Sequence, residues 1–354
     1  MARPVLIRPN ARFECHSDGT CCTTIHLLGP LKKEEAKAVE RHARLVLPTY
    51  KSGGTVFHEG IKEPVFGTHN QRCVFMDDNA RCRFHTTVGE ACRPQVCRRF
   101  PLGATKTPHG TRITVSHRCP CVSIGEGRPL DEARARACLS SAKTGKITHD
   151  VKVDDTVLWR GDKAIDFNAY VAWETNLIEQ LDGAGPQPRL SHVLGMDHSL
   201  QLPRLRKKSW NDFSKRMLVW VQDEDEEDGF FSAIRWAALE LRDAPNPWSP
   251  PMRPWDWTLR RTAQRVVNPD SPRRIYGSWL ADYIWAMAWT AEGSVYQAKA
   301  NMTARYALAR RIASRLNKTG TRADLAAAEA IMIVDVVGAS EPWEWVQKLL
   351  VEDP

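Results

Sequence analysis

The cysteines are the residues of this chain whose type and spacing indicate chemistry. The 354-residue chain has ten cysteines, and all of them lie between Cys15 and Cys138. They gather in three clusters, at residues 13–22, 73–97 and 116–121, with Cys138 apart. Thiolates are soft ligands that select zinc, copper(I) or iron–sulfur centres, so this clustering predicts a metal site. For Cys138 we favour the other role of cysteine, that of a small buried apolar residue.

The spacing of the cysteines favours an iron–sulfur cluster over zinc. A zinc site takes four ligands, typically as two close pairs, whereas a four-iron cluster accepts up to four thiolates with more varied spacings. No Cys-x-x-Cys pair occurs in the sequence, and Cys21-Cys22 and Cys119-Pro120-Cys121 are closer together than the usual zinc pair. We predict a four-iron cluster, with zinc as the alternative metal. Ten cysteines exceed the need of one centre, so either two sites exist or some cysteines are spare.

The predicted metal ligands come from all three clusters. They are Cys15, Cys21, Cys22, Cys73, Cys82, Cys92, Cys97 and Cys119. Asp18 and His85 lie inside the clusters and either ligate or support the centre. Arg98 and Arg99 follow Cys97, where they either lower the pKa of the thiol, hold an anion, or are simply solvated.

Over residues 13–127 the order of these motifs resembles the CxxCxxCC, or YkgJ-type, metal-chelating family, which includes the flagellin lysine-N-methylase FliB. The positions that carry the resemblance are Phe13, Cys15, Gly19, Cys21, Cys22, Cys73, Phe75, Cys82, Cys92, Cys97, Arg98, Phe100, Pro101, Cys119, Pro120, Gly125 and Gly127. Asp18 stands where the family has its second cysteine, so it either supplies an oxygen ligand or does not ligate. The resemblance implies a cysteine-held iron–sulfur cluster and, in the FliB-like branch, methylation of protein lysines by S-adenosylmethionine.

The residues alone do not reveal a site for S-adenosylmethionine. The sequence has neither a Gly-x-Gly-x-x-Gly loop nor a Cys-x-x-x-Cys-x-x-Cys run. A methyl-transfer site needs an aromatic face for the sulfonium cation and a lysine held neutral. Tyr170, Tyr283, Tyr296 or one of the tryptophans is a candidate for that face, and nothing in the sequence selects among them.

Charge and hydropathy limit the partners. The net charge of +8 comes from scattered basic residues without a long Lys/Arg block, so a nucleic-acid partner is not favoured. The most apolar stretch, residues 279–291, is shorter than the roughly 20 residues that span a bilayer. The first residues do not have the pattern of a secretory signal. We therefore expect no membrane partner and a cytoplasmic protein, whose thiols stay reduced.

Composition divides the chain into two regions. All thirteen tryptophans lie from Trp159 onward, after the last cysteine. We predict an α+β protein with a small, irregular, cysteine-rich metal-binding region at 1–145 and a mainly α-helical, Trp-rich domain at 146–354. Periodicity predicts helices at 32–47 and 130–141 and a strand at 111–115. In the second region it predicts helices at 167–181, 213–221, 231–241, 280–288, 306–316, 323–337 and 343–351, with a proline-rich break at 245–254.

The sequence supports two candidate functions, an enzyme and a non-enzymatic metal-binding protein. The first is an iron–sulfur enzyme that methylates protein lysines with S-adenosylmethionine, as the resemblance implies. The second is a non-enzymatic iron- or zinc-binding or redox protein whose helical domain binds a partner. A zinc-type nucleic-acid-binding protein is a weaker third candidate.

Overall fold

A four-stranded sheet joins the beginning and the middle of the chain. In the computed structural model the described residues are 3–46, 54–57, 62–89, 92–124, 127–141, 144–196, 201–225, 227–242 and 251–350. The strand order is β1 (Val5–Ile7), β7 (Gly110–Val115), β6 (Leu102–Thr107) and β8 (Val151–Lys152). Strands β6 and β7 form an antiparallel hairpin, while β1 and β8 add to its edges in parallel. The predicted strand at 111–115 is confirmed as β7.

Six of the cysteines lie on short elements around this sheet. These elements are η1 (Thr20–Cys22), β5 (Arg72–Cys73), α3 (Gln95–Arg99), α4 (Pro120–Ser123) and α5 (Glu132–Leu139). Cys82 and Cys119 are the N-cap residues of α2 (Arg83–Val88) and α4. Helix α1 (Lys33–Val46) packs with the small hairpins β2–β3 (Thr55–Val56, Val65–Phe66) and β4–β5 (Thr68–His69, Arg72–Cys73). The predicted helix at 32–47 is confirmed as α1, although Leu47 lies outside the described residues. The helix at 130–141 is confirmed as α5, where the Asp131 carboxylate caps the first turn by accepting from Arg134 N.

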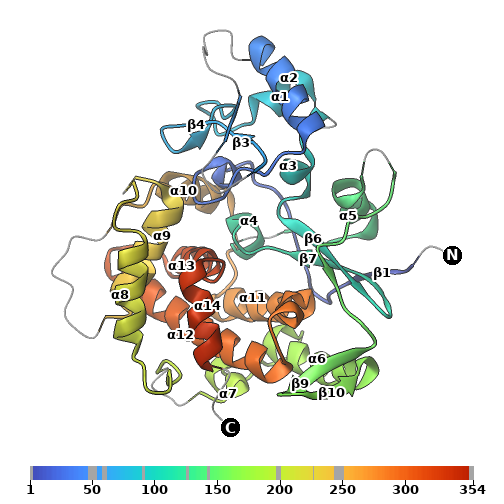
Figure 1. The fold of residues 1–354 in the computed structure, drawn as a ribbon, viewed down its shortest axis with the longest axis vertical. Coiled ribbons are helices and arrows are strands. Elements are labelled where there is room, and N and C mark those ends of the chain that lie inside the picture. The colour runs from blue at the N-terminus through green and yellow to red at the C-terminus, as the bar shows by residue number, and fades with distance from the viewer. Residues whose placement is uncertain are drawn as a thin grey trace.

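The second region is a helical assembly, as predicted, and it completes an α+β fold (Figure 1). A hairpin of β9 (Thr156–Arg160) and β10 (Lys163–Asp166) leads into it. Its helices are α6 (Phe167–Asp182), α7 (Leu190–Leu194), α8 (Trp210–Trp220), α9 (Gly229–Glu240), α10 (Asp256–Arg265), α11 (Pro272–Ala286), α12 (Val295–Lys318), α13 (Ala323–Val337) and α14 (Glu341–Leu350), with η3 (Ala288–Ala291) after α11. Residues 245–250 of the predicted break lie outside the described part. Helices α7 and α10 are not among the predicted elements.

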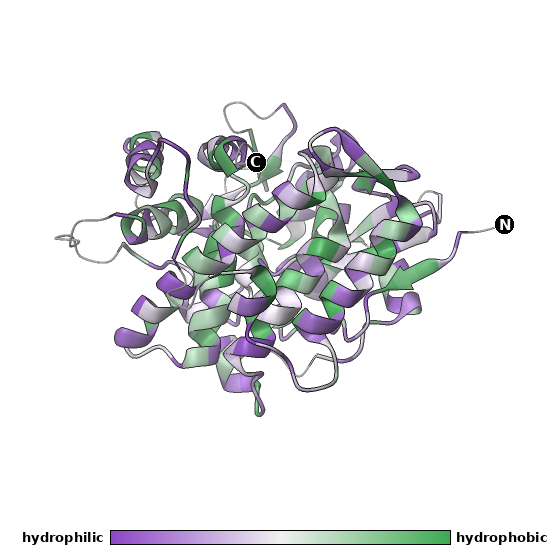
Figure 2. Cartoon of the chain, turned by 90° about the horizontal axis from the view of Figure 1, so that it is seen from below, coloured by the Kyte–Doolittle hydropathy of each residue, from purple (hydrophilic) through white to green (hydrophobic). Residues whose placement is uncertain are grey.

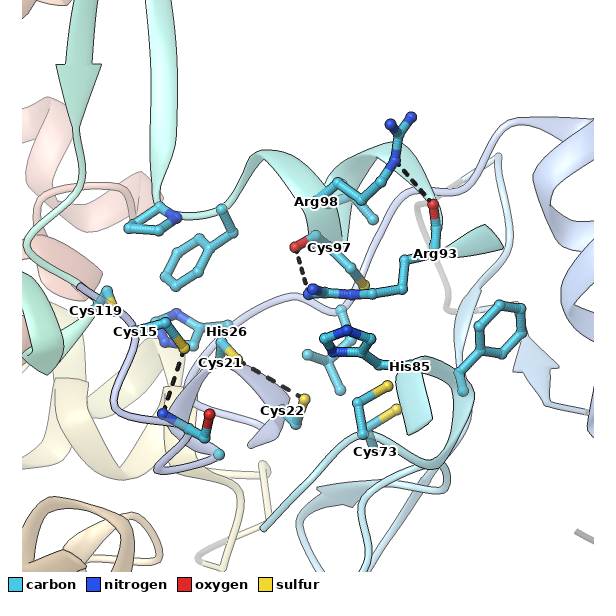
Figure 3. A pocket seen from close by; sticks show the side chains of 18 of the residues that line it. Cys15, Cys21, Cys22, His26, Cys73, His85, Arg93, Cys97, Arg98 and Cys119 are labelled. Atoms are coloured by element: carbon cyan, nitrogen blue, oxygen red, sulfur yellow. Dashed lines mark hydrogen bonds between the residues drawn. The ribbon is translucent and has the colours of Figure 1, made fainter. Parts of the chain in front are cut away.

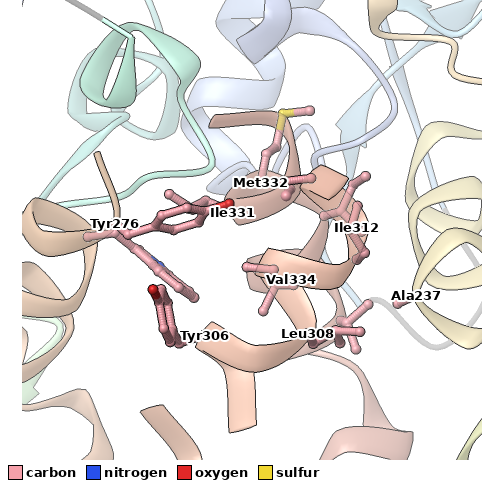
Figure 4. Close-up of a cluster of buried hydrophobic side chains, with 14 of the residues drawn as sticks. Ala237, Tyr276, Tyr306, Leu308, Ile312, Ile331, Met332 and Val334 are labelled. Atoms are coloured by element: carbon pink, nitrogen blue, oxygen red, sulfur yellow. The ribbon is translucent and has the colours of Figure 1, made fainter. Parts of the chain in front are cut away.

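Helix α13 forms the centre of the helical region. Nearly all of its side chains are buried, as expected for a helix that is apolar on all sides. Its neighbours include α9, α11 and α12. The helices seen from below in Figure 2 carry hydrophilic as well as hydrophobic residues. Ile331 and Val334 pack with Leu308 and Ile312 of α12 (Figure 4). Trp236, Trp255 and Trp343 are fully buried nearby, so these tryptophans are core residues.

The cysteine-rich part lies at one end of this helical assembly (Figure 1). Helix α4 contacts α10, α11 and α13 directly. Polar contacts add to this packing, because the Thr20 hydroxyl donates to the Thr258 hydroxyl at 2.7 Å. Within the described residues no helix is both long and apolar enough to cross a membrane.

Candidate metal centre

Nine of the ten cysteines line a single cavity of about 500 Å³. These cysteines are Cys15, Cys21, Cys22, Cys73, Cys82, Cys97, Cys119, Cys121 and Cys138. Figure 3 shows several of them around the cavity. The structure therefore brings together seven of the eight predicted ligands, and it adds Cys121 and Cys138. The eighth, Cys92, is exposed and is not part of this lining, and its role as a ligand stays a prediction.

Gly19 sets the turn that carries Cys21 and Cys22 into the cavity. Its φ of +83° lies in the left-handed region, which an L side chain rarely adopts. A Cβ at this position would lie 2.8 Å from Ala80 Cβ and 2.9 Å from Met76 Sδ. Both the backbone conformation and the lack of space therefore require glycine here.

Five of the thiols form a first set. These are Cys21, Cys22, Cys73, Cys82 and Cys97, each of which lies close enough to others of the set to raise their pKa values electrostatically. The Sγ atoms of Cys21 and Cys22 are 3.9 Å apart. Burial raises the pKa of Cys97 to about 12, and it also raises the pKa of Cys73 and Cys82. A metal that binds here must displace protons from these thiols.

Arg93 is the arginine that faces this first set. Its positive charge opposes the rise in the pKa of Cys82 and Cys97, and its Nη2 donates to the Cys97 carbonyl at 2.8 Å. Sequence reasoning pointed instead to Arg98 and Arg99. Arg98 lines the cavity and donates through Nε to the Arg93 carbonyl at 3.1 Å, whereas Arg99 pairs with Asp150 at 2.6 Å.

Cys15, Cys119 and Cys121 form a second set. Cys121 makes side-chain hydrogen bonds to both of the others, and the bond to Cys15 lowers the pKa of the Cys15 thiol to about 6. The same hydrogen bonds raise the pKa of Cys121. Cys21 lies near enough to raise the pKa of Cys119, so the two sets adjoin in one cavity.

Asp18 anchors this second set to the helical region. Its Oδ1 accepts from Thr20 N at 2.9 Å, and its Oδ2 accepts from the Thr262 hydroxyl of α10 and from Cys121 Sγ at 3.4 Å. The side chain is buried, with 3% exposure. Asp18 stands where the CxxCxxCC family has a cysteine. Both oxygens of its carboxylate accept hydrogen bonds from neighbouring residues.

Two histidines line the cavity within the described residues. His85, which the sequence singled out, is exposed at the start of α2. His26 was missed, because a lone histidine after the first cluster shows no motif. Burial lowers the pKa of His26 to about 3, and the positive charge of Arg118 acts in the same direction, so the ring is neutral at pH 7. Its ring packs against Phe100 with centroids 5.0 Å apart.

The aromatic lining of the cavity consists of phenylalanines. They are Phe13, Phe66, Phe75, Phe84 and Phe100. The tyrosines suggested by the sequence lie elsewhere. Tyr170 and Tyr283 are held inside the helical region by Glu174 and Asn301, respectively, and Tyr296 is exposed. An aromatic face for a ligand of this cavity must therefore come from a phenylalanine.

The chemistry of the donors suits either a zinc or an iron–sulfur centre, because both take thiolates. Within the described residues no group of three or more His, Cys, Asp or Glu side chains is arranged to hold a metal ion. The nine thiols line one cavity, and the choice between the two centres stays a prediction.

The fold and the site together define an α+β protein with a thiol-lined cavity. Comparison of this chain with protein families, with curated proteins and with solved structures gives no match. The resemblance to the CxxCxxCC family therefore stays a prediction that rests on the residues named above.

Proposed function

We propose that this chain is an iron–sulfur protein and, more specifically, a protein lysine N-methyltransferase that uses S-adenosylmethionine. The observation that carries the first part is the convergence of nine cysteines, from segments spread over more than a hundred residues, on one cavity. Reduced thiols gathered in this way are typical of a metal centre. We place the protein in the cytoplasm, where thiols stay reduced.

Different residues of the cavity would bind the cluster, offset its charge and fix the loops around it. The first set offers more thiolates than the four that a four-iron cluster takes, and Arg93 offsets part of their negative charge. Asp18 and Thr262 fix the loop that carries the second set. When bound, the cluster would supply electron transfer.

The size and lining of the cavity support the finer proposal. A volume of about 500 Å³ lies within the roughly 300–1,000 Å³ that small-molecule sites occupy. Phenylalanine faces attract a sulfonium cation. In the reaction, the nitrogen of a neutral lysine bonds to the methyl carbon, the carbon–sulfur bond breaks, and its electron pair stays on sulfur. The proton of the amine then passes to water.

Anaerobic purification followed by iron, sulfide and zinc analysis tests the cluster. We expect matched iron and sulfide and a broad absorption band. Cys97→Ser, in the first set, should lower the iron content strongly. Cys92→Ser should retain it, because Cys92 lies outside the cavity lining. A colourless protein with stoichiometric zinc would contradict the proposal. Loss of iron from the Cys92→Ser protein would make Cys92 a ligand, as the sequence predicts.

Methyl transfer needs a separate test. Loaded protein should bind S-adenosylmethionine in a calorimetric titration and transfer labelled methyl groups to lysines of a protein substrate, with mass increments of one methylene each. A loaded protein without affinity for that cofactor would instead support the alternative, a metal-binding or redox protein whose helical domain binds a partner.

A further inference from the structure

His26 is a buried histidine with one ring nitrogen unused. The side chain is 8% exposed and lines the thiol cavity. Figure 3 shows it at the end of the cavity where Cys15 and Cys119 lie. Its Nε2 is buried and has no hydrogen-bond partner among the described residues. Native proteins rarely leave a buried polar atom in this state, so the atom calls for a ligand.

The backbone holds the ring of His26. The ring hydrogen-bonds the backbone of Arg118, the residue before Cys119, and this bond opposes the fall that burial causes in the pKa of His26. Since Nε2 has no partner among the described residues, this nitrogen stays available to a ligand.

A ring held on one side with a nitrogen available on the other suits a metal ligand. Such a histidine binds through one nitrogen, while the N–H of the other is held by a carbonyl or carboxylate that sets the ring's orientation. His26 also lies beside a cysteine that lines the cavity, through its bond to Arg118.

We propose that His26 is a nitrogen ligand, through Nε2, of the metal centre in this cavity. This inference rests on the proposed iron–sulfur site and deepens it. The centre then has mixed thiolate and imidazole ligands, and replacing thiolate by imidazole raises the reduction potential of a cluster. The backbone of Arg118 acts as the positioning group.

Pulsed electron paramagnetic resonance of the reduced, cluster-loaded protein tests the assignment. Protein labelled with ¹⁵N-histidine should show the coupling of a directly bound nitrogen, with the isotope shift that identifies histidine. His85→Gln removes the only other cavity histidine of the described chain and should retain this coupling. His26→Gln should lose it while keeping sulfide and most of the iron, and its reduction potential should change.

The outcomes separate the two proposals. Loaded wild-type protein without a histidine coupling, or a coupling that persists in His26→Gln or disappears in His85→Gln, would overturn the role of His26 and leave the cluster in place. If His26→Gln does not fold, the labelled wild-type and His85→Gln proteins still decide the question. A protein that holds neither iron nor sulfide would overturn the cluster and the His26 ligand together.

Discussion

Replacement of Arg8 by methionine is expected to destabilise the protein severely. Arg8 is buried, with 1% exposure, at the end of β1. Its guanidinium donates to Asp182 at 2.5 Å, to Asp282 at 2.7 and 2.9 Å, and to Ser278 at 2.9 Å. It is thus the charge that joins the N-terminal strand to α6 and α11. Methionine would keep much of the volume and remove the charge and all of these hydrogen bonds.

The size of the effect follows from what is left behind. Removal of one partner of a buried ion pair costs about 3–5 kcal/mol, because the other charge stays buried without compensation. Here two carboxylates remain, so we expect a loss near 5 kcal/mol. That is a large share of the roughly 5–15 kcal/mol by which a domain is stable.

The loss should depend on pH in a defined direction. Burial opposes the ionisation of Asp282, but Arg8 and His117 outweigh it and hold the pKa of Asp282 below its usual value. Such a carboxylate contributes stability above its unfolded pKa of about 3.9, and this contribution is lost as the pH falls through the folded pKa. The deficit of Arg8→Met relative to the wild type should therefore be larger at pH 7 than near pH 4.

Urea unfolding followed by circular dichroism measures both quantities. Arg128→Met is the matched control, because Arg128 pairs with Glu14 at 3.3 Å on the surface and such pairs contribute about 0–1 kcal/mol. The reasoning fails if Arg8→Met lies within about 1 kcal/mol of the control. It fails equally if the deficit grows on acidification.

Two further predictions concern the cavity turn and the helical core. Gly19→Ala should cost about 1–3 kcal/mol and lower the iron content, because the left-handed turn and the contact with Ala80 both exclude a Cβ; unchanged iron and urea midpoint would contradict this. Burial raises the pKa of Glu329, although Arg253 and Trp255 oppose the rise, so its contribution is present below about pH 4.3 and declines as the pH rises through the folded pKa. The wild type should therefore lose stability relative to Glu329→Gln as the pH rises above about 4.3 in the same unfolding assay, and the opposite slope would refute the prediction.

The elements with strong periodicity were the ones that the sequence predicted well. Helix α13 and α6 show continuous or regularly spaced apolar residues, and local pattern alone identifies them. Helix α10 was missed because its ten residues include Arg260, Arg261 and Arg265 and few apolar ones. The edge strands β1 and β8 were missed for another reason. They are three and two residues long, and only their pairing with β7 and β6 defines them.

The part of the site that could be predicted from the sequence is the part marked by an unusual residue type, cysteine. Seven of the eight cysteines predicted as ligands share the cavity, and their role as ligands stays a prediction. His26 and Arg93 have no such signature. His26 becomes a candidate only when its burial, its free Nε2 and its bond to Arg118 are seen together. Arg93 emerges only when the fold places its charge beside Cys82 and Cys97.

The helical region helps to position the second thiol set through a buried hydrogen-bond network. Asp282 of α11 accepts from His117 Nε2 at 3.0 Å, and the other ring nitrogen of His117 bonds the Ser123 hydroxyl at 2.9 Å. His117 and Ser123 flank Cys119 and Cys121 in the sequence. Because Arg8 binds the same Asp282, one buried network fixes the sheet, α11 and the segment that carries two thiols. Part of the wall of the thiol cavity therefore depends on the helical region.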